Sequence, residues 1–134
     1  MLKVGLIGCG FMGTMHANCY KVLDGVTLAA VADIRPEKAA QLADGAEIFG
    51  DGKDLIEKAD VDVIDICLPT YLHADFAVKA MEKGINVITE KPISLKKEDV
   101  ERVYSTAKKN KISDEQFIAE AVEAAKGKDA VVLF

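Results

Sequence analysis

Residues 2–17 of this 134-residue chain read LKVGLIGCGFMGTMHA. An apolar run, Lys3–Ile7, leads directly into the glycine-rich segment Gly8–Gly13, and helical periodicity begins at Phe11. The run has no polar alternation, which is typical of a strand in a parallel sheet that is covered on both faces. This opening predicts a strand, a tight turn and a helix in immediate succession.

The same alternation continues along the chain and predicts the fold class. We expect strands at Lys3–Ile7, Val26–Ala32, Val61–Leu68, Asn86–Thr89 and Ala130–Phe134. Helical periodicity between them predicts helices over Phe11–Leu23, Pro36–Ala43, Gly52–Ala59, Leu72–Lys83, Leu95–Lys109 and Phe117–Lys126. Gly84 should end the fourth helix, and Ser94, with Glu98 or Lys97 nearby, should cap the fifth. The pattern predicts one α/β domain over residues 1–134, with a Rossmann-like doubly wound parallel sheet in three α/β/α layers.

Composition and charge narrow the class of partner. Half of the residues are apolar, 29% are charged, and the formal net charge is -5. This balance is that of a globular domain, and mild acidity argues against a nucleic-acid or anionic-membrane partner. No segment reaches the roughly 18 apolar residues that span a bilayer, and the N-terminus does not read as a secretion signal.

The cysteines indicate a reducing compartment. Cys9, Cys19 and Cys67 are odd in number, and their spacing matches neither a zinc site nor a CxxC redox pair. We therefore expect buried free thiols, a cytoplasmic location and no metal site.

The glycine segment carries the functional prediction. Gly8-Cys9-Gly10-Phe11-Met12-Gly13 spells G-x-G-x-x-G between a strand and a helix, and Asp33 lies 20 residues beyond Gly13 at the end of the second strand. This is the arrangement of a dinucleotide site. Gly8 permits the tight turn, Gly10 lets a pyrophosphate approach the backbone, and Gly13 lets the helix pack against the sheet. We expect Phe11 and Met12 beside the cofactor, whose phosphates meet the positive end of the helix.

Asp33 also bears on the choice of cofactor. Its carboxylate can accept both hydroxyls of an adenosine ribose, and it would repel a 2′-phosphate, so NAD is expected. Ile34 and Arg35 follow it and should line the same end of the site. Since the Arg35 guanidinium could hold a 2′-phosphate, NADP remains the alternative.

Three stretches resemble one family. VGLIGCGFMGTMHA, VADI and VDVIDICLPTYLHADFAVKAMEKGINVITEKPISL are similar to the NAD(P)-binding domain of the Gfo/Idh/MocA family, the glucose-fructose oxidoreductase and inositol dehydrogenase group, over residues 2–110. Glu90-Lys91-Pro92 is the most specific element. The segment Pro69–His73 resembles the family's P-x-x-x-H loop.

The resemblance implies an oxidoreductase that moves a hydride between a sugar or polyol and nicotinamide. It places Lys91 near the nicotinamide and the substrate hydroxyl, as the catalytic residue that shares its proton, and Glu90 near the nicotinamide ribose. It also implies a cofactor cleft lined by Leu68, Pro69, Thr70 and His73. From the residues alone, a local hydrogen bond is an equal alternative for His73, and His16 is expected to pack or bond locally.

Two departures from the family follow. Its members continue into a substrate domain with further acid–base residues, so we expect this chain to bind the cofactor without turnover, the sugar or polyol belonging to the parent enzyme. From Lys111 the sequence diverges: an amphipathic helix over Gln116–Lys126 and a parallel strand over Asp129–Phe134, beside Asn86–Thr89, should complete the sheet. The tail weakly resembles a unit of family 3 glycoside hydrolases and suggests an engineered chimera.

Three other functions stay open. The chain could be a working dehydrogenase whose substrate site forms on a partner chain, or an engineered scaffold with an incidental cofactor site. A methyltransferase using S-adenosylmethionine also has glycines after its first strand. Its usual G-x-G-x-G spacing does not fit Gly13, and it gives no reason for Glu90-Lys91-Pro92. The oligomeric state is open as well.

Overall fold

The computed structural model describes residues 1–109. The expected helix over Gln116–Lys126, the expected strand over Asp129–Phe134 and the suggested chimera concern residues 110–134 and lie outside the described residues.

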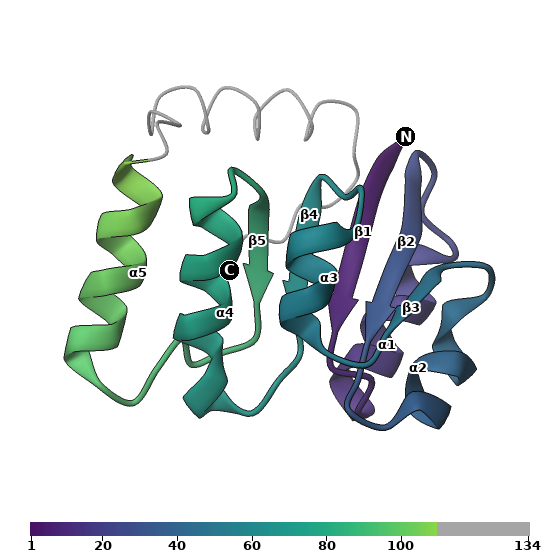
Figure 1. The fold of residues 1–134 in the computed structure, drawn as a ribbon, viewed down its shortest axis with the longest axis horizontal. Helices are drawn as coiled ribbons and strands as arrows, with labels where there is room; N and C mark the ends of the chain where they lie inside the picture. The colour runs from purple at the N-terminus through teal and green to yellow at the C-terminus, as the bar shows by residue number, and fades with distance from the viewer. Residues whose placement is uncertain (110–134) are drawn as a thin grey trace, which may run out of the picture.

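Within residues 1–109, five parallel strands form the sheet: β1 (Leu2–Ile7), β2 (Val26–Ala32), β3 (Glu47–Phe49), β4 (Val63–Ile66) and β5 (Asn86–Thr89). Their order is β3-β2-β1-β4-β5, so the chain starts in the middle strand and the sheet grows to both sides of it (Figure 1). Ile7 pairs with Ala32 on one side and with Ile66 on the other. The carboxyl ends of β1, β2 and β4 therefore meet at one edge, where open α/β sheets bind ligands.

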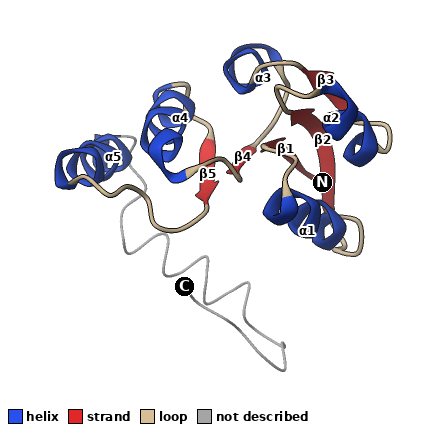
Figure 2. Ribbon diagram, turned by 90° about the horizontal axis from the view of Figure 1, so that it is seen from below, coloured by secondary structure: helices blue, strands red, loops and turns tan. Residues whose placement is uncertain are grey.

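Helices cover both faces of the sheet (Figure 2). They are α1 (Phe11–Tyr20), α2 (Pro36–Ala43), α3 (Gly52–Lys58), α4 (Thr70–Glu82) and α5 (Lys97–Lys109). Ala17 of α1 and Leu42 of α2 pack with Leu6 and Val31 on one face. The opposite face buries α3 and α4 against the sheet, through Leu55, Ile56, Phe76 and Ala77 packed on Ile7, Ile64 and Ile66. The prediction of a doubly wound, three-layer α/β fold is confirmed.

Some element bounds differ from the expected ones. The strand β3 was not expected, because it has only three residues and buries only Phe49, so it carries no apolar run. Its place is fixed by pairing with β2. Helix α1 ends at Tyr20 rather than Leu23, and α5 begins at Lys97 rather than Leu95.

Two helix ends show how local chemistry sets the bounds. Gly84 follows the last turn of α4 with a φ of 78°, and the Ile85 N–H donates to the Ala80 carbonyl, as expected of a terminating glycine. At the other site, the Ser94 hydroxyl accepts from the Lys96 N–H and donates to Asp99. The partners of the Ser94 hydroxyl are therefore Lys96 and Asp99, and the expectation of Glu98 or Lys97 as its partner is wrong.

The three thiols are unpaired, but they are not all buried. Cys9 is buried and Cys67 is half-buried, whereas Cys19 lies on the exposed side of α1. The expectation of buried thiols therefore fails for Cys19. Within residues 1–109, none of the helices has the length and apolar character needed to cross a membrane.

Candidate functional site

A cleft of about 660 Å³ opens at the carboxyl edge of the sheet. Its volume is within the roughly 300–1,000 Å³ typical of small-molecule sites. The structure brings together many of the residues expected there: Gly8, Gly10, Phe11, Met12, Asp33, Ile34, Arg35, Leu68 and Pro69. The lining also includes residues that the sequence did not single out: Ile7, Ala32, Asp51, Gly52, Lys53, Cys67, Tyr71, Leu72 and Phe76.

The three glycines of the turn have different surroundings. Gly8 has a φ of 98°, and a Cβ there would overlap the backbone carbonyl of Cys67. A Cβ on Gly13 would overlap the Gly8 carbonyl oxygen. Around Gly10, by contrast, nothing described lies within 4 Å of such a Cβ. The fold itself therefore requires Gly8 and Gly13, whereas packing does not require Gly10, which borders the cleft.

The space beside Gly10 faces the start of α1. Gly10 is the N-cap of the helix and offers no side-chain acceptor, and the first turn contains no acidic residue. The N–H groups of a first turn lack partners inside the helix and carry the positive end of the helix dipole. The turn is therefore suited to bind an anionic group such as a phosphate.

Asp33 joins the end of β2 to the glycine turn. Its Oδ2 accepts the Cys9 N–H at 2.9 Å, and its Oδ1 accepts the Arg35 N–H at 2.9 Å and the Arg35 Nε–H at 3.2 Å. Burial raises the pKa of this carboxyl, but the two backbone N–H groups and the guanidinium outweigh burial and hold the pKa below its usual value. Asp33 is therefore an ionised acceptor at neutral pH.

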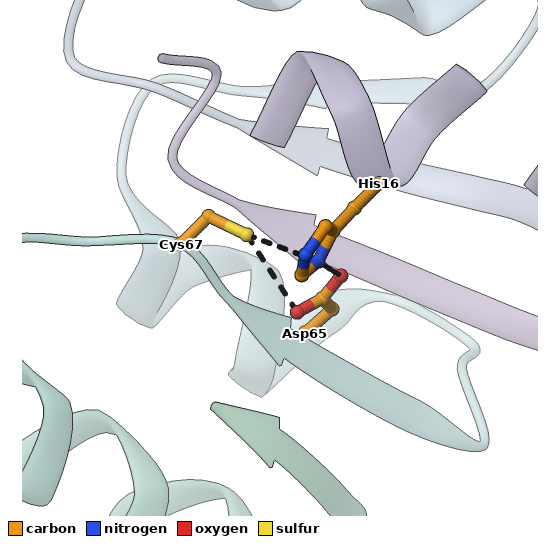
Figure 3. A group of neighbouring side chains, drawn as sticks. All are labelled: His16, Asp65 and Cys67. Carbon is orange, nitrogen blue, oxygen red and sulfur yellow. Dashed lines mark hydrogen bonds and ion pairs between the residues drawn. The ribbon is translucent and has the colours of Figure 1, made fainter. Parts of the chain in front are cut away.

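A second polar group lies beneath the first helix (Figure 3). Asp65 of β4 is fully buried, and its Oδ2 lies 2.8 Å from His16 Nδ1. Tyr20 donates to the same oxygen at 2.6 Å, and the Cys67 thiol donates to Oδ1 at 3.7 Å. The expected local bond of His16 is therefore wrong, because the histidine bonds to the neighbouring strand rather than within its own helix. An aspartate within an apolar strand needs a buried hydrogen-bond partner. The position of Asp65 within an apolar run could therefore have indicated a buried polar cluster from the sequence alone.

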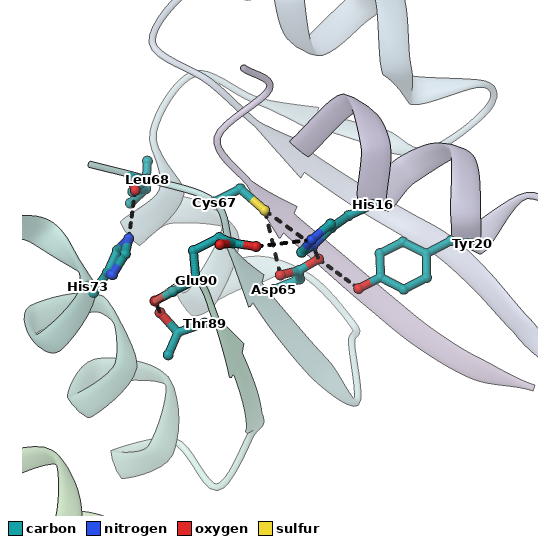
Figure 4. Close-up of polar contacts among 8 residues, drawn as sticks. All are labelled: His16, Tyr20, Asp65, Cys67, Leu68, His73, Thr89 and Glu90. Carbon is teal, nitrogen blue, oxygen red and sulfur yellow. Dashed lines mark hydrogen bonds and ion pairs between the residues drawn. The ribbon is translucent and has the colours of Figure 1, made fainter. Parts of the chain in front are cut away.

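The remaining expected residues lie outside the cleft lining. Figure 4 shows His73 and Glu90 among them. His73 is buried, with Nε2 at 2.6 Å from the Leu68 carbonyl and Nδ1 at 2.9 Å from the Pro92 carbonyl. It therefore ties the end of β4 to the loop that carries Lys91. Glu90 directs Oε1 to His16 Nε2 at 3.2 Å. The lining excludes Gly13, Thr70, His73, Glu90 and Lys91, whose roles toward a cofactor stay predictions.

The thiols beside the cleft are protonated at neutral pH. Burial, with Asp33 nearby, raises the pKa of Cys9 to about 11. Burial and the carboxylates of Asp65 and Glu90 also raise the pKa of Cys67. Neither thiol is activated as a nucleophile.

The sheet order, the glycine turn and the buried acid after β2 define a Rossmann-type domain of the dinucleotide-binding class. The Gfo/Idh/MocA oxidoreductase family, described by its NAD-binding Rossmann fold, matches residues 2–113. The chain belongs to this family.

Curated relatives include sugar and polyol dehydrogenases. The chain is 32% identical over 111 residues to a myo-inositol 2-dehydrogenase of Thermotoga maritima, covering 81% of this chain and 33% of that protein. It is 34% identical over 125 residues to a levoglucosan dehydrogenase of Pseudarthrobacter phenanthrenivorans, covering 83% and 31%. The chain thus spans about a third of the length of these relatives.

Solved structures agree on the fold. An apo scyllo-inositol dehydrogenase from Lactobacillus casei superposes with a TM-score of 0.78 at 25% identity, covering 94% of this chain and 42% of that one. The WlbA dehydrogenase of Chromobacterium violaceum, solved with NADH and UDP-GlcNAcA, gives a TM-score of 0.76 at 29% identity, covering 81% and 32%.

Proposed function

We propose that this domain binds a nicotinamide dinucleotide in the cleft, with NAD preferred to NADP. The pyrophosphate lies over Gly10 and the first turn of α1, and the adenosine ribose lies at Asp33. The observation that carries the proposal is the contrast among the glycines: Gly10 alone of the three is not required by packing, and it borders the cleft. Its open space gives a phosphate direct access to the backbone.

The preference for NAD rests on the hydrogen bonds of Asp33. An ionised carboxylate has about four acceptor positions, and the protein uses three of them. The Arg35 side chain is 54% exposed, so its guanidinium can leave Oδ1 and open a second position for a ribose hydroxyl. A 2′-phosphate would instead bring like charge toward Asp33. Arg35 and Lys53 line the same cleft and are the two cations that would favour NADP.

In the parent enzyme, we propose a sugar or polyol as the substrate. The bound nicotinamide exchanges a hydride with a carbinol carbon of that substrate. Lys91 orients the substrate hydroxyl and shares its proton, while Glu90 lies at the nicotinamide ribose. Both residues follow the carboxyl end of β5, on the ligand-binding edge of the sheet. His73 positions their loop through the Pro92 carbonyl.

Titration calorimetry of the 134-residue chain with NADH, NADPH and S-adenosylmethionine tests the proposal. We expect saturable binding of NADH, weaker binding of NADPH and none of S-adenosylmethionine. Binding of the last alone would indicate a methyltransferase. Absence of binding by all three would leave a scaffold with an incidental site and would overturn the proposal.

Asp33→Ala should weaken NADH binding and narrow the gap to NADPH. Losing hydrogen bonds to a charged acceptor costs about 1.5–3 kcal/mol, or roughly 10- to 150-fold in Kd. The same titrations measure both affinities. Asp54→Ala, which removes an exposed acid of α3 outside the cleft lining, is the matched control and should leave both unchanged. Equal affinities of Asp33→Ala and the unmodified chain would place Asp33 outside the site.

We also propose that this chain alone does not turn over. Dehydrogenation needs the carbinol carbon held against the nicotinamide with an acid–base group in reach. Lys91 is the one such group that the resemblance identifies in the chain. We expect no NAD-dependent oxidation of inositol or glucose above background, followed as NADH absorbance. A rate that depends on the cofactor and disappears in Lys91→Ala would contradict this expectation.

A further inference from the structure

We propose that His16, Asp65 and Cys67 form a zinc site, with Nδ1 of His16, one carboxylate oxygen of Asp65 and Sγ of Cys67 as the three protein ligands. The site does not depend on the proposed cofactor function. It was not expected from the sequence, because its ligands come from α1, from β4 and from the residue after β4, and they lie up to 51 residues apart along the chain.

The spacing of the three donors fits one ion. They lie within 4.8 Å of one another (Figure 3). His16 Nδ1 is 2.8 Å from Asp65 Oδ2 and 3.4 Å from Cys67 Sγ, and Cys67 Sγ is 3.7 Å from Asp65 Oδ1. A tetrahedral zinc ion, about 2.3 Å from sulfur and about 2.0 Å from nitrogen or oxygen, separates its donors by roughly 3.3–3.6 Å. With Asp65 Oδ1 as the ligand oxygen, both contacts of the sulfur lie close to this range, whereas the 2.8 Å contact of His16 Nδ1 is with the other oxygen, Oδ2. Zinc bound through Oδ1 therefore replaces the contact between His16 and Oδ2 by a bond from His16 to the ion.

The charge around the group favours a cation. Asp65 is fully buried and Glu90 is 22% exposed at its side chain, and both carboxylates face His16. Within residues 1–109, no lysine or arginine forms an ion pair with either acid. Zinc offsets the same negative charge, and on binding it displaces the Cys67 thiol proton to solvent.

Outer hydrogen bonds hold two of the ligands in place. When Nδ1 of His16 binds the ion, the ring proton resides on Nε2, which faces Glu90 Oε1 at 3.2 Å (Figure 4). A histidine ligand that donates its other N–H to a carboxylate is the usual arrangement in zinc sites. Tyr20 likewise donates to Asp65 at 2.6 Å and fixes the carboxylate.

The donor types select zinc among the common divalent ions. Magnesium and calcium take oxygen ligands, whereas a thiolate with an imidazole and a carboxylate suits zinc. Three protein ligands leave the fourth position for water or another small ligand. Cys67 also lines the cleft, so the ion has a path to solvent on that side.

Cobalt substitution tests the site without reference to activity. The chain has three cysteines, and the exposed Cys19 could bind metal adventitiously, so the measurement uses Cys19→Ser. We expect one equivalent of Zn²⁺ by calorimetry. Co²⁺ should give a thiolate-to-cobalt charge-transfer band that added Zn²⁺ abolishes. Cys67→Ser and His16→Gln on this background should lose the band, while Glu90→Gln should weaken zinc binding by about 10- to 100-fold.

Circular dichroism establishes that each variant is folded. The zinc titration of Cys19→Ser tests the site with all three proposed ligands unchanged. Absence of saturable zinc binding to folded Cys19→Ser would overturn the proposal and leave His16, Asp65 and Cys67 as a structural hydrogen-bond group. A cobalt band that persists in Cys67→Ser would assign the metal to Cys9 and would overturn it equally.

Discussion

Gly13→Ala is expected to lower the free energy of unfolding by roughly 3 kcal/mol or more, the upper end of the cost of overpacking. The added methyl group would overlap the carbonyl oxygen of Gly8, which belongs to the backbone and cannot move aside as a side chain can. The start of α1 would have to shift away from the turn and lose packing of Ala17 on the sheet. Urea denaturation measures the loss, and the melting temperature should fall by on the order of 10 °C.

Gly10→Ala is the matched control for this substitution. It lies three residues earlier in the same motif, and its new methyl group meets nothing described within 4 Å. We expect a change in unfolding free energy of about 1 kcal/mol or less, since alanine is a poorer N-cap than glycine. Equal losses at the two positions would mean that the close approach of α1 to Gly8 does not limit the fold.

Gly10→Val is expected to lose NADH binding while the domain stays folded. Its backbone is extended, with φ of −79°, so valine fits the conformation. The branched side chain would fill the space through which a pyrophosphate reaches the first-turn N–H groups. We expect the Kd for NADH, measured by calorimetry, to rise by at least about 100-fold, equivalent to about 2.7 kcal/mol.

Gly50→Val is the control for the loss of binding. Gly50 is exposed, also has nothing described within 4 Å of an added Cβ, and does not line the cleft. It should keep the NADH affinity of the unmodified chain. Full affinity in Gly10→Val would move the pyrophosphate away from the glycine turn and contradict the proposed pose.

Local sequence signals predicted most of the fold. The bounds Pro36–Ala43 and Asn86–Thr89 agree with the structure, because a proline opens the first and the second is a short apolar run after Gly84. The strand β3 could not be found in this way. Its residues are mostly exposed, and they become a strand through their pairing with β2. That pairing depends on tertiary structure rather than on local pattern.

The same distinction holds for the site. The glycine turn and Asp33 are recognisable because their spacing along the chain matches a known dinucleotide-binding motif. Lys53 and Tyr71 reach the cleft only because α3 and α4 begin at the same edge of the sheet as α1. The contact of His16 with Asp65 joins a helix to a strand 49 residues away, and no local spacing reports it.

The hydrogen bond from the Cys9 N–H to Asp33 has a consequence for engineering the coenzyme preference. The Asp33 carboxylate braces the glycine turn, and in the proposed pose the same carboxylate would repel a 2′-phosphate. A redesign toward NADP that simply removes the Asp33 side chain would weaken binding of the pyrophosphate, which both coenzymes contain. Asp33→Ser or Asp33→Asn would remove the negative charge and keep an oxygen that accepts from the Cys9 N–H, so support of the turn would be retained without repulsion of the 2′-phosphate. Arg35 would then be released to meet the new phosphate.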